Sequence, residues 1–303
     1  MASGYDLTSV RDVRELLEKY SLAPKKAFGQ NFLINRDVPE RIAASAAEGA
    51  KEGTTALEIG PGVGSMTVRL AGYFDKVVAV EIDRGLIPLL EDTLSDCANV
   101  KVINADFLKL SLSELLEGEA GGKSVRVCAN LPYYVTTPVL MKILESFPPV
   151  GKPRVESVTV MIQSEVAERL CASAGSPDYG AVTASVALHG RVEKLFTVAP
   201  GNFYPAPKVT SSVVRITMHE RGVKDVFLDA PEDPDECEKF IARVKKLISL
   251  AFLKRRKTLT NALSGEFPKE AVAAALSSLG IREDVRGERL TARDFCALAK
   301  ALG

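Results

Sequence analysis

The sequence predicts an α/β protein in which a mostly parallel, doubly wound sheet with an antiparallel edge hairpin is followed by a small all-helical domain. Three observations support this fold class. From Thr55 onward, short apolar runs alternate with amphipathic segments, which is typical of strands joined by crossover helices. Polar landmarks recur where those runs end, at the sheet edge where such folds bind ligands. Beyond residue 236 only helix-like segments remain.

The elements of the sheet are expected in a regular order, with a glycine-rich loop between the first strand and its helix. The expected strands are 55–59, 76–82, 100–103, 125–129 and 156–162, and the expected helices between them are 65–71, 86–92 and 138–145. Farther on, the pattern predicts a helix over 181–189 and strands over 192–198 and 212–218. These last two strands are the candidates for the antiparallel pair at one sheet edge.

Composition divides the chain of 303 residues into four expected parts. Residues 1–22 predict an amphipathic helical extension, and residues 23–218 carry the sheet. Residues 219–236 are acidic and contain prolines, which indicates a linker. Residues 237–303 are expected to be a helical domain, with Thr291 as a cap for its last helix.

Charge is balanced overall but not locally. The 39 basic residues cancel the 39 acidic ones, so net charge says nothing about partners. Between Lys239 and Lys257, however, every charged residue is basic. Such a stretch is either a solvated helix face or a surface that attracts a polyanion. If it binds RNA, the densest cluster is expected to hold the phosphate backbone: Lys254, Arg255, Arg256 and Lys257.

The sequence argues against several classes of protein. Its five cysteines include no Cys-x-x-Cys pair, which disfavours a zinc site or a disulfide scaffold and fits a reducing compartment. The two histidines, His189 and His219, lie outside any triad or ligand pattern. No run of eighteen apolar residues occurs, and the first segment contains acids that a secretory leader avoids. We therefore expect a cytoplasmic protein with no metal and no membrane segment.

The motif Asn130-Leu131-Pro132-Tyr133 follows the apolar run 125–129. An asparagine side-chain oxygen and a backbone carbonyl beside a proline can both accept hydrogen bonds from an exocyclic amino group, and a tyrosine offers a face for stacking a base. By itself such a string is also a common turn. Its position downstream of a glycine-rich loop makes these four residues the candidate catalytic group.

The glycine-rich loop after the first strand favours a nucleoside cofactor without phosphates. Its spacing does not fit the Gly-x-Gly-x-x-Gly pattern of a pyrophosphate site, because position 65 is a serine, and this disfavours a nicotinamide oxidoreductase. Gly60 and Gly62 permit close approach of a ligand to the backbone. Glu81 ends the second strand and predicts an acceptor for both ribose hydroxyls. Asp106 ends the third and predicts an acceptor for the adenine amino group.

Ordered strings along nearly the whole chain resemble the ribosomal RNA adenine dimethyltransferase family, which are class I S-adenosylmethionine-dependent enzymes with a Rossmann-like sheet. The strings are Lys25-Lys26-Ala27-Phe28-Gly29-Gln30-Asn31-Phe32-Leu33, Glu58–Gly64, Val80-Glu81-Ile82-Asp83, Asn104-Ala105-Asp106, Asn130-Leu131-Pro132-Tyr133-Tyr134-Val135-Thr136-Thr137-Pro138 and Phe203-Tyr204-Pro205-Ala206-Pro207-Lys208-Val209. The resemblance implies S-adenosyl-L-methionine as the cofactor.

The resemblance also implies roles for single residues. Asn31 and Leu33 would belong to a segment that closes over the cofactor, and Gly60 would line the methionine end. Asn130 would touch both the cofactor and the target base. Phe203 is expected to stack an extruded base together with Tyr133.

The reaction implied is methyl transfer to N6 of two adjacent adenosines in the 3′-terminal hairpin of small-subunit ribosomal RNA, giving N6,N6-dimethyladenosine. The expected partner is this RNA within a pre-ribosomal 30S-type particle. The enzyme is expected to be a monomer with a role in small-subunit biogenesis. Leu131 followed by Tyr133 and Tyr134 resembles the small-subunit enzyme more than the sister group acting on large-subunit RNA. Two alternatives stay open: a non-catalytic nucleic-acid-binding assembly factor, and an adenine-N6 methyltransferase of large-subunit RNA or DNA.

Overall fold

The computed structural model describes residues 4–146 and 155–303 and divides the chain into two compact units. Among the described residues, unit 1 comprises 4–146, 155–167 and 193–217, and unit 2 comprises 168–192 and 218–303. The division differs from the expected domain boundaries at residues 218 and 236, which stay predictions.

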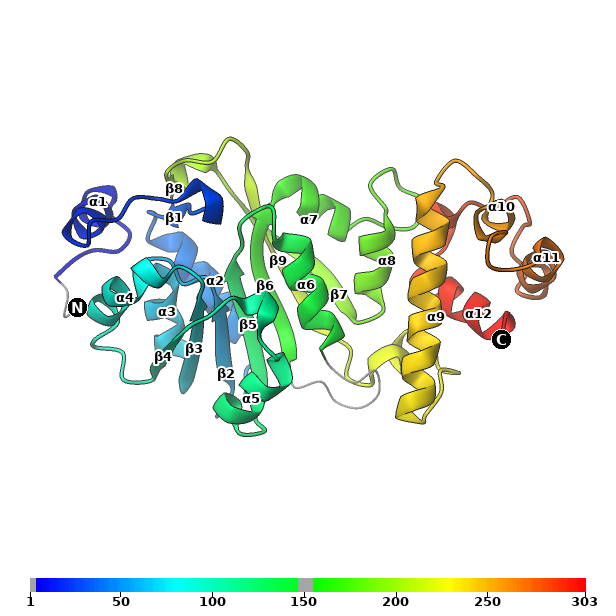
Figure 1. Ribbon diagram of the computed structural model, residues 1–303, viewed down its shortest axis with the longest axis horizontal. Coiled ribbons are helices and arrows are strands. Elements are labelled where there is room, and N and C mark those ends of the chain that lie inside the picture. Colours follow the sequence, from blue (N-terminus) through cyan, green and yellow to red (C-terminus); the bar gives the residue numbers. More distant parts are fainter. Residues whose placement is uncertain (1–3, 147–154) are drawn as a thin grey trace. The chain divides into compact units, whose positions relative to one another are not determined.

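Unit 1 is built around a twisted sheet with the strand order β4-β3-β2-β5-β6-β9-β7 (Figure 1). Strands β2, β3, β4, β5 and β6 run parallel, and β9 pairs antiparallel with β6. Strand β7 is the neighbour of β9 at the sheet edge. The predicted fold class, a mostly parallel sheet with an antiparallel edge, is confirmed.

The strands in chain order are β1 (Phe32–Leu33), β2 (Thr55–Ile59), β3 (Lys76–Glu81), β4 (Val100–Asn104), β5 (Val125–Asn130), β6 (Val155–Gln163), β7 (Gly190–Val198), β8 (Phe203–Tyr204) and β9 (Ser211–Met218). All strands expected from the sequence are present, within about two residues of their expected ends. Strands β2 and β5 are buried along nearly their whole length, because helices cover both faces of the sheet.

Helices α2 to α8 lie in connections between strands, whereas α1 precedes the first strand and α9 to α12 follow the last one. They are α1 (Val10–Lys19), α2 (Asp37–Ala47), α3 (Ser65–Tyr73), α4 (Ile87–Thr93), α5 (Leu112–Ala120), α6 (Thr136–Glu145), α7 (Ser164–Leu170), α8 (Ala181–Ala187), α9 (Pro234–Leu253), α10 (Leu259–Leu263), α11 (Lys269–Ser278) and α12 (Ala292–Ala301). Helices α2 and α3 pack on each other, and α2 also packs on β5 and β6. Thr291 caps α12 as expected, accepting a hydrogen bond from the backbone N–H of Asp294.

The order of strands creates a crevice at the centre of the sheet. Strand β2 has β3 on one side and β5 on the other, so the chain moves outward in one direction through β3 and β4 and in the other through β5 and β6. In open α/β sheets, ligands bind beyond the carboxyl ends of the strands at such a reversal. The fold therefore predicts a site above β2, β3 and β5.

A second, two-stranded sheet was not expected from the sequence. Strands β1 and β8 pair antiparallel, with Phe32 opposite Tyr204 and Leu33 opposite Phe203. Both strands have two residues, too few for an alternating pattern to reveal them. The pairing ties the segment expected to close over the cofactor to the segment expected to stack a base.

Unit 2 is helical and has its own hydrophobic core, formed by α9 with α8, α10 and α12. Part of the segment expected to be a linker belongs to this core, since Val223 and Ala230 are buried in it. Helix α9 begins at Pro234, where Asp233 caps it, three residues before the expected start of the helical domain at residue 237. Among the described residues, no helix is long and apolar enough to cross a membrane.

Candidate cofactor and target-base site

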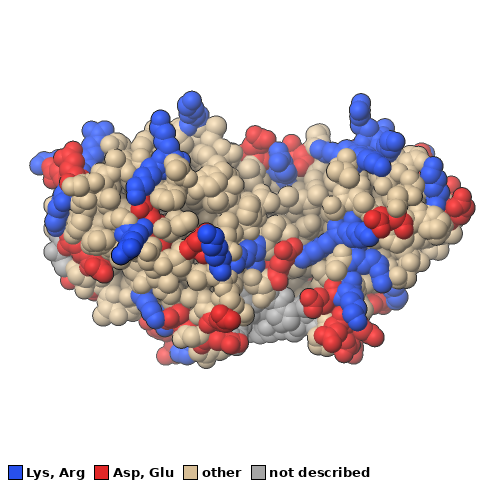
Figure 2. Space-filling model, in the orientation of Figure 1, with Lys and Arg blue, Asp and Glu red and all other residues tan. Residues whose placement is uncertain are grey.

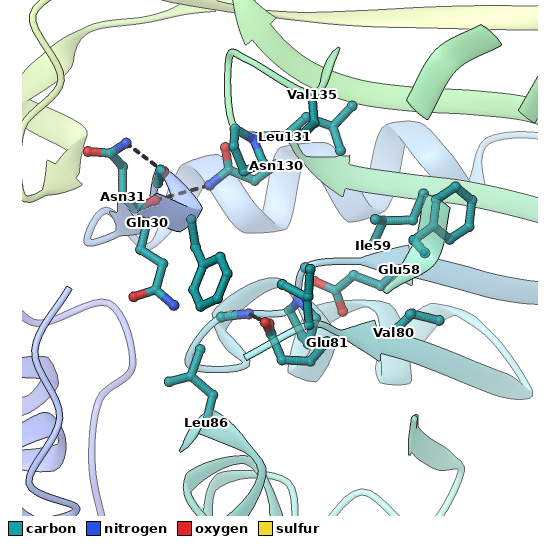
Figure 3. Close-up of a pocket in the computed structure, with 18 of the residues that line it drawn as sticks. Gln30, Asn31, Glu58, Ile59, Val80, Glu81, Leu86, Asn130, Leu131 and Val135 are labelled. Carbon is teal, nitrogen blue, oxygen red and sulfur yellow. Dashed lines mark hydrogen bonds between the residues drawn. The ribbon is translucent and has the colours of Figure 1, made fainter. Parts of the chain in front are cut away.

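A pocket in unit 1 opens at the carboxyl ends of β2, β3, β4 and β5 (Figure 3). It is lined by the segment before β1, the glycine-rich loop, the turns that follow β3 and β4, the turn that follows β5, and β8. Every residue that the sequence nominates for cofactor binding or catalysis lines it: Asn31, Leu33, Gly60, Gly62, Glu81, Asp106, Asn130, Leu131, Pro132, Tyr133 and Phe203. Their individual roles stay predictions.

The loop between β2 and α3 brings bare backbone to the pocket wall. Gly60, Gly62 and Gly64 all have positive φ angles, of 73°, 61° and 90°, a conformation that side chains disfavour. A β-carbon on Gly62 would lie 3.1 Å from the ring of Phe32, whereas one on Gly60 would meet nothing within 4 Å. The loop is thus packed against β1 at one glycine and open to a ligand at another.

Glu81 ends β3 and is buried against this loop. One carboxylate oxygen accepts a hydrogen bond from the Gly62 N–H at 3.3 Å, and the other accepts from the Asp83 N–H at 2.8 Å. Burial raises the pKa of Glu81, while these backbone hydrogen bonds oppose the rise. A carboxylate has further lone pairs, so Glu81 can still accept hydrogen bonds from a diol.

Glu58 lines the same pocket from the end of β2, and its carboxyl group points toward Glu81 (Figure 3). It is fully buried, and neither oxygen has a hydrogen-bond partner among the described residues. Burial, reinforced by the negative charge of Glu81, raises the pKa of Glu58 to about 8, although the nearby Thr67 hydroxyl acts in the opposite direction. An uncompensated carboxyl group at this depth suits a ligand with a cationic portion.

Asp106 follows β4 and lines the pocket in a half-buried position. One of its carboxylate oxygens accepts a hydrogen bond from the Leu108 N–H at 3.0 Å, which caps a short helical turn over Phe107–Lys109. The other oxygen is 3.6 Å from Lys109 Nζ. The turn therefore orients the carboxylate at the edge of the pocket where an adenine amino group is expected.

Asn130 ends β5, and its side chain is oriented by the segment before β1. Its Nδ2 donates a hydrogen bond to the backbone carbonyl of Asn31 at 3.1 Å (Figure 3). The side-chain amide of Asn31 in turn donates to the Gly29 carbonyl at 3.0 Å. Because the amide nitrogen of Asn130 is engaged, its side-chain oxygen is the group available to accept a hydrogen bond.

The aromatic candidates differ in their exposure. Phe203 is buried among the side chains that pack α2 and α3 on the sheet, and it also lines the pocket. Tyr133 is half-buried, and its hydroxyl lies 3.1 Å from the hydroxyl of Ser211. Tyr134, which the sequence did not nominate, also lines the pocket and is 62% exposed. An exposed aromatic face beside the pocket is available for contact with a base.

Glu58 and Gln30 also line the pocket without having been nominated from the sequence. Glu58 stood out only as the start of the glycine-rich loop, because a carboxylate inside an apolar run gives no sign that it will be buried. Gln30 lines the pocket and contacts Asp83, 53 residues away in sequence. Its place in the string that carries the family resemblance was the available signal.

The basic cluster at Lys254–Lys257 lies in unit 2, directly after α9, and Figure 2 shows basic side chains gathered where that helix ends. All four residues are exposed. Arg255 also has a structural contact, since it donates hydrogen bonds to the carbonyls of Pro177 and Tyr179 at 3.2 and 3.0 Å. Within the described residues, no group of histidine, cysteine and carboxylate side chains could hold a metal ion.

The residues around the pocket fit S-adenosylmethionine. Glu81 offers acceptors for a ribose, and Gly60 leaves the backbone open. Glu58 is a buried carboxyl group that has no hydrogen-bond partner among the described residues, and a cationic ligand would compensate its burial. Together with the order of strands, these features define a class I S-adenosylmethionine-dependent methyltransferase.

Comparison with known proteins narrows the class to a family. The model of the family described as "Ribosomal RNA adenine dimethylase" matches residues 22–303, and this chain belongs to that family. A protein of Alkaliphilus oremlandii named ribosomal RNA small subunit methyltransferase A is 42% identical over 299 residues, covering 98% of each chain. One of the same name from Shouchella clausii is 41% identical over 302 residues, covering 98% of this chain and 96% of its own.

Solved structures agree on the fold. The crystal structure of the 23S rRNA methyltransferase ErmE superimposes with a TM-score of 0.66 at 25% identity, covering 90% of this chain and 99% of that one. A dimethyladenosine transferase from Plasmodium falciparum gives the same TM-score at 23% identity, covering 86% and 93%. The similarity to this second structure supports the fold alone.

Proposed function

We propose that this protein transfers methyl groups from S-adenosylmethionine to N6 of two adjacent adenosines in the 3′-terminal hairpin of small-subunit ribosomal RNA, giving N6,N6-dimethyladenosine. The observation that carries the proposal is the orientation of Asn130, whose amide nitrogen is held by the Asn31 carbonyl so that its oxygen is free to accept. This acceptor lies in the same pocket as the expected ribose acceptor Glu81.

The chemistry follows from how an adenine amino group is held. Its nitrogen lone pair is delocalised into the ring and is a poor nucleophile. The side-chain oxygen of Asn130 accepts one amino hydrogen, and the carbonyl of Leu131 or Pro132 accepts the other, which draws the nitrogen toward tetrahedral geometry and aims its lone pair. When bound, the cofactor supplies an activated methyl group on a sulfonium with a neutral leaving group. Alignment can then supply most of the rate, with no strong base.

Cofactor binding is assigned to the remaining pocket residues. Glu81 accepts from the ribose hydroxyls, Asp106 accepts from the adenine amino group, and Gly60 and Gly62 permit close approach to the backbone. Asn31 and Leu33 cover the cofactor from the segment around β1. These roles are supported by the position of all six residues around one pocket.

Tyr133 and Phe203 are assigned to stack the extruded adenine, a contribution of roughly 1–3 kcal/mol per base. Tyr133 is the half-buried member of the pair and Phe203 the buried one. The exposed ring of Tyr134 beside them suits contact with a neighbouring nucleotide.

The small subunit as substrate is supported by the names of the two relatives at 41–42% identity, both ribosomal RNA small subunit methyltransferase A. We further propose that the protein acts as a monomer in the cytoplasm, on RNA within a 30S-type pre-ribosomal particle. Lys254, Arg255, Arg256 and Lys257 are assigned to the RNA backbone, because all four are exposed.

The first experiment is methyl transfer from labelled S-adenosylmethionine to unmethylated small ribosomal subunits, with mass spectrometry of the digested RNA. We expect dimethyladenosine at two adjacent adenines of the 3′-terminal hairpin. If large-subunit RNA or DNA is labelled instead, the proposed substrate is wrong, but the proposed methyl-transfer chemistry still holds. If the protein binds the cofactor but labels none of these substrates, the result would favour a non-catalytic assembly factor.

Asn130→Ala removes the proposed acceptor. We expect methyl transfer to fall by at least about a hundredfold, since the target amino group loses its alignment, while calorimetry still detects cofactor binding. Asn35→Ala, outside the pocket, is the matched control and should leave turnover unchanged. Turnover near the normal level in Asn130→Ala would overturn the role of this residue.

A further inference from the structure

Residues 25–31, here called the strap, lie in unit 1. They run from the carboxyl end of β3 to the carboxyl end of β5. None of these seven positions is buried. The strap is therefore not held in place by the hydrophobic core, and its position depends on polar contacts and close backbone packing at its two ends.

Asp83 anchors the first end. Its carboxylate accepts hydrogen bonds from Lys25 Nζ at 2.7 Å and from Gln30 Nε2 at 2.9 Å, and also from the Gly85 N–H at 3.0 Å. Gln30 closes the connection by accepting from the Lys25 N–H at 2.8 Å. Burial alone would raise the pKa of Asp83, but the hydrogen bonds from Lys25 and Gln30 hold it below its ordinary value. The carboxylate is thus ionised and fully engaged.

The second end rests on the catalytic motif. The backbone of Gly29, with φ of 58°, approaches Pro132 so closely that an added β-carbon would lie 2.9 Å from Cβ of Pro132. Two residues later, the Asn31 carbonyl accepts the hydrogen bond from Asn130. The direction of the Asn130 amide is therefore set by the position of the strap.

We propose that Asp83 is a positioning residue for methyl transfer: by holding Lys25 and Gln30 it fixes the strap, and the strap orients the Asn130 side chain toward the target amino group. The inference rests on the proposed role of Asn130. It connects a residue beside the ribose acceptor Glu81 with the group that holds the base, although Asp83 itself does not line the pocket.

If Asp83 acted on methyl transfer through Glu81, removing its charge would improve the ribose acceptor and not weaken it. The charge of Asp83 raises the pKa of Glu81, so removal of that charge favours the ionised form of Glu81, which is the better acceptor for a ribose. The Glu81 oxygen that contacts residue 83 accepts from its backbone N–H, which Asp83→Asn retains. Loss of activity in Asp83→Asn would therefore not arise from a weakened ribose acceptor.

The test compares Asp83→Asn with Asp92→Asn. Asp92 makes two contacts of similar length, to Lys19 Nζ at 2.7 Å and to the Tyr20 hydroxyl at 2.9 Å, but these hold α1 and not the strap. We expect Asp83→Asn to lower kcat about tenfold with a change of less than about twofold in KM for the RNA, and Asp92→Asn to retain normal kcat. Unchanged kcat in Asp83→Asn, or equal losses in both variants, would overturn the proposal.

Two further measurements separate positioning from general destabilisation. In a double-mutant cycle, Lys25→Met should cost little once Asp83→Asn is present, because both break the same anchor; additive losses would count against the anchor. In the cofactor-free protein, the side-chain amide resonance of Asn130, assigned by its absence in Asn130→Ala, should lose its exchange protection in Asp83→Asn. This readout needs no catalysis, so it tests the strap even if Asn130 proves not to be the acceptor.

Discussion

At the scale of single residues, the pocket contains two buried carboxyl groups with different hydrogen bonding. Glu81 accepts hydrogen bonds from two backbone N–H groups, which oppose the rise in its pKa that burial causes. Glu58 has no hydrogen-bond partner among the described residues, and its pKa is raised to about 8 by burial and by the charge of Glu81. In the absence of ligand, Glu58 is therefore largely protonated at neutral pH, and its neutral form is the one that folding favours.

The stability of the cofactor-free protein should depend on Glu58 between about pH 4.5 and pH 8. Because its pKa is higher in the folded protein than in the unfolded chain, its stabilising contribution is present below pH 4.5 and is lost as the pH rises toward 8. Glu58→Gln cannot ionise, so we expect its Tm to fall less than that of the wild type between pH 5 and 8. Parallel profiles by calorimetry would contradict this.

Glu81→Ala tests the ribose acceptor. Charge-assisted hydrogen bonds contribute roughly 1.5–3 kcal/mol each, so we expect the Kd for S-adenosylmethionine to rise at least about tenfold by isothermal titration calorimetry. Glu91→Ala, an exposed position on α4, is the control. An unchanged Kd for Glu81→Ala would rule out the assigned role.

The residues that the sequence nominated and those that it did not differ for a physical reason. Asn130, Glu81 and Asp106 follow strands whose apolar runs are easy to recognise, and parallel strands bring their carboxyl ends to one edge. The state of Glu58 depends on what packs around it in three dimensions, which the sequence does not display. Asp83 acts through Lys25 and Gln30, more than fifty positions away.

At the scale of elements, the strands of the main sheet could be predicted from the sequence, whereas those of the small sheet could not. Strands β2 to β6 are recognisable because each has at least five residues, more than half of them apolar. The pairing of β1 with β8 involves two residues on each side and depends on where the strap and the segment after β7 are placed. Local pattern cannot predict such a ladder, although the family resemblance marked both segments.

Gly29 provides a test at this scale. Gly29→Ala puts a methyl group 2.9 Å from Pro132 and a side chain at a φ of 58°, so either the strap or the Asn130–Tyr133 turn must shift. We expect turnover to fall more than about tenfold. Gly49→Ala is the matched control, since its φ is 69° and its added methyl group meets nothing within 4 Å. Similar turnover in the two variants would argue that backbone strain alone, and not contact with Pro132, is responsible for any effect.

At the scale of the whole molecule, the pocket lies in unit 1 and the Lys254–Lys257 cluster lies in unit 2. The sequence placed that cluster by charge alone. It did not reveal that Arg255 also joins the end of α9 to the backbone at Pro177 and Tyr179, because those partners are distant in sequence.

Neutralising Lys254, Arg256 and Lys257 to glutamine should flatten the salt dependence of RNA binding, because each phosphate that is no longer neutralised reduces the slope by about 0.7–0.9. Fluorescence anisotropy at several salt concentrations measures this slope. Arg255→Gln is kept separate, since removing its hydrogen bonds to Pro177 and Tyr179 should lower the Tm as well. An unchanged slope in the triple variant would place the RNA-binding surface elsewhere.

The small β1–β8 sheet has a consequence for the order in which the molecule is made. Synthesis proceeds from the N-terminus, and a nascent chain that has just completed β6 already contains Glu58, Glu81 and Asn130 on paired strands. It still lacks Tyr204, the partner of Phe32. The wall that β1 and β8 form together is thus among the last parts of unit 1 to be assembled, because it cannot be completed before Tyr204, two thirds of the way along the chain, has been translated.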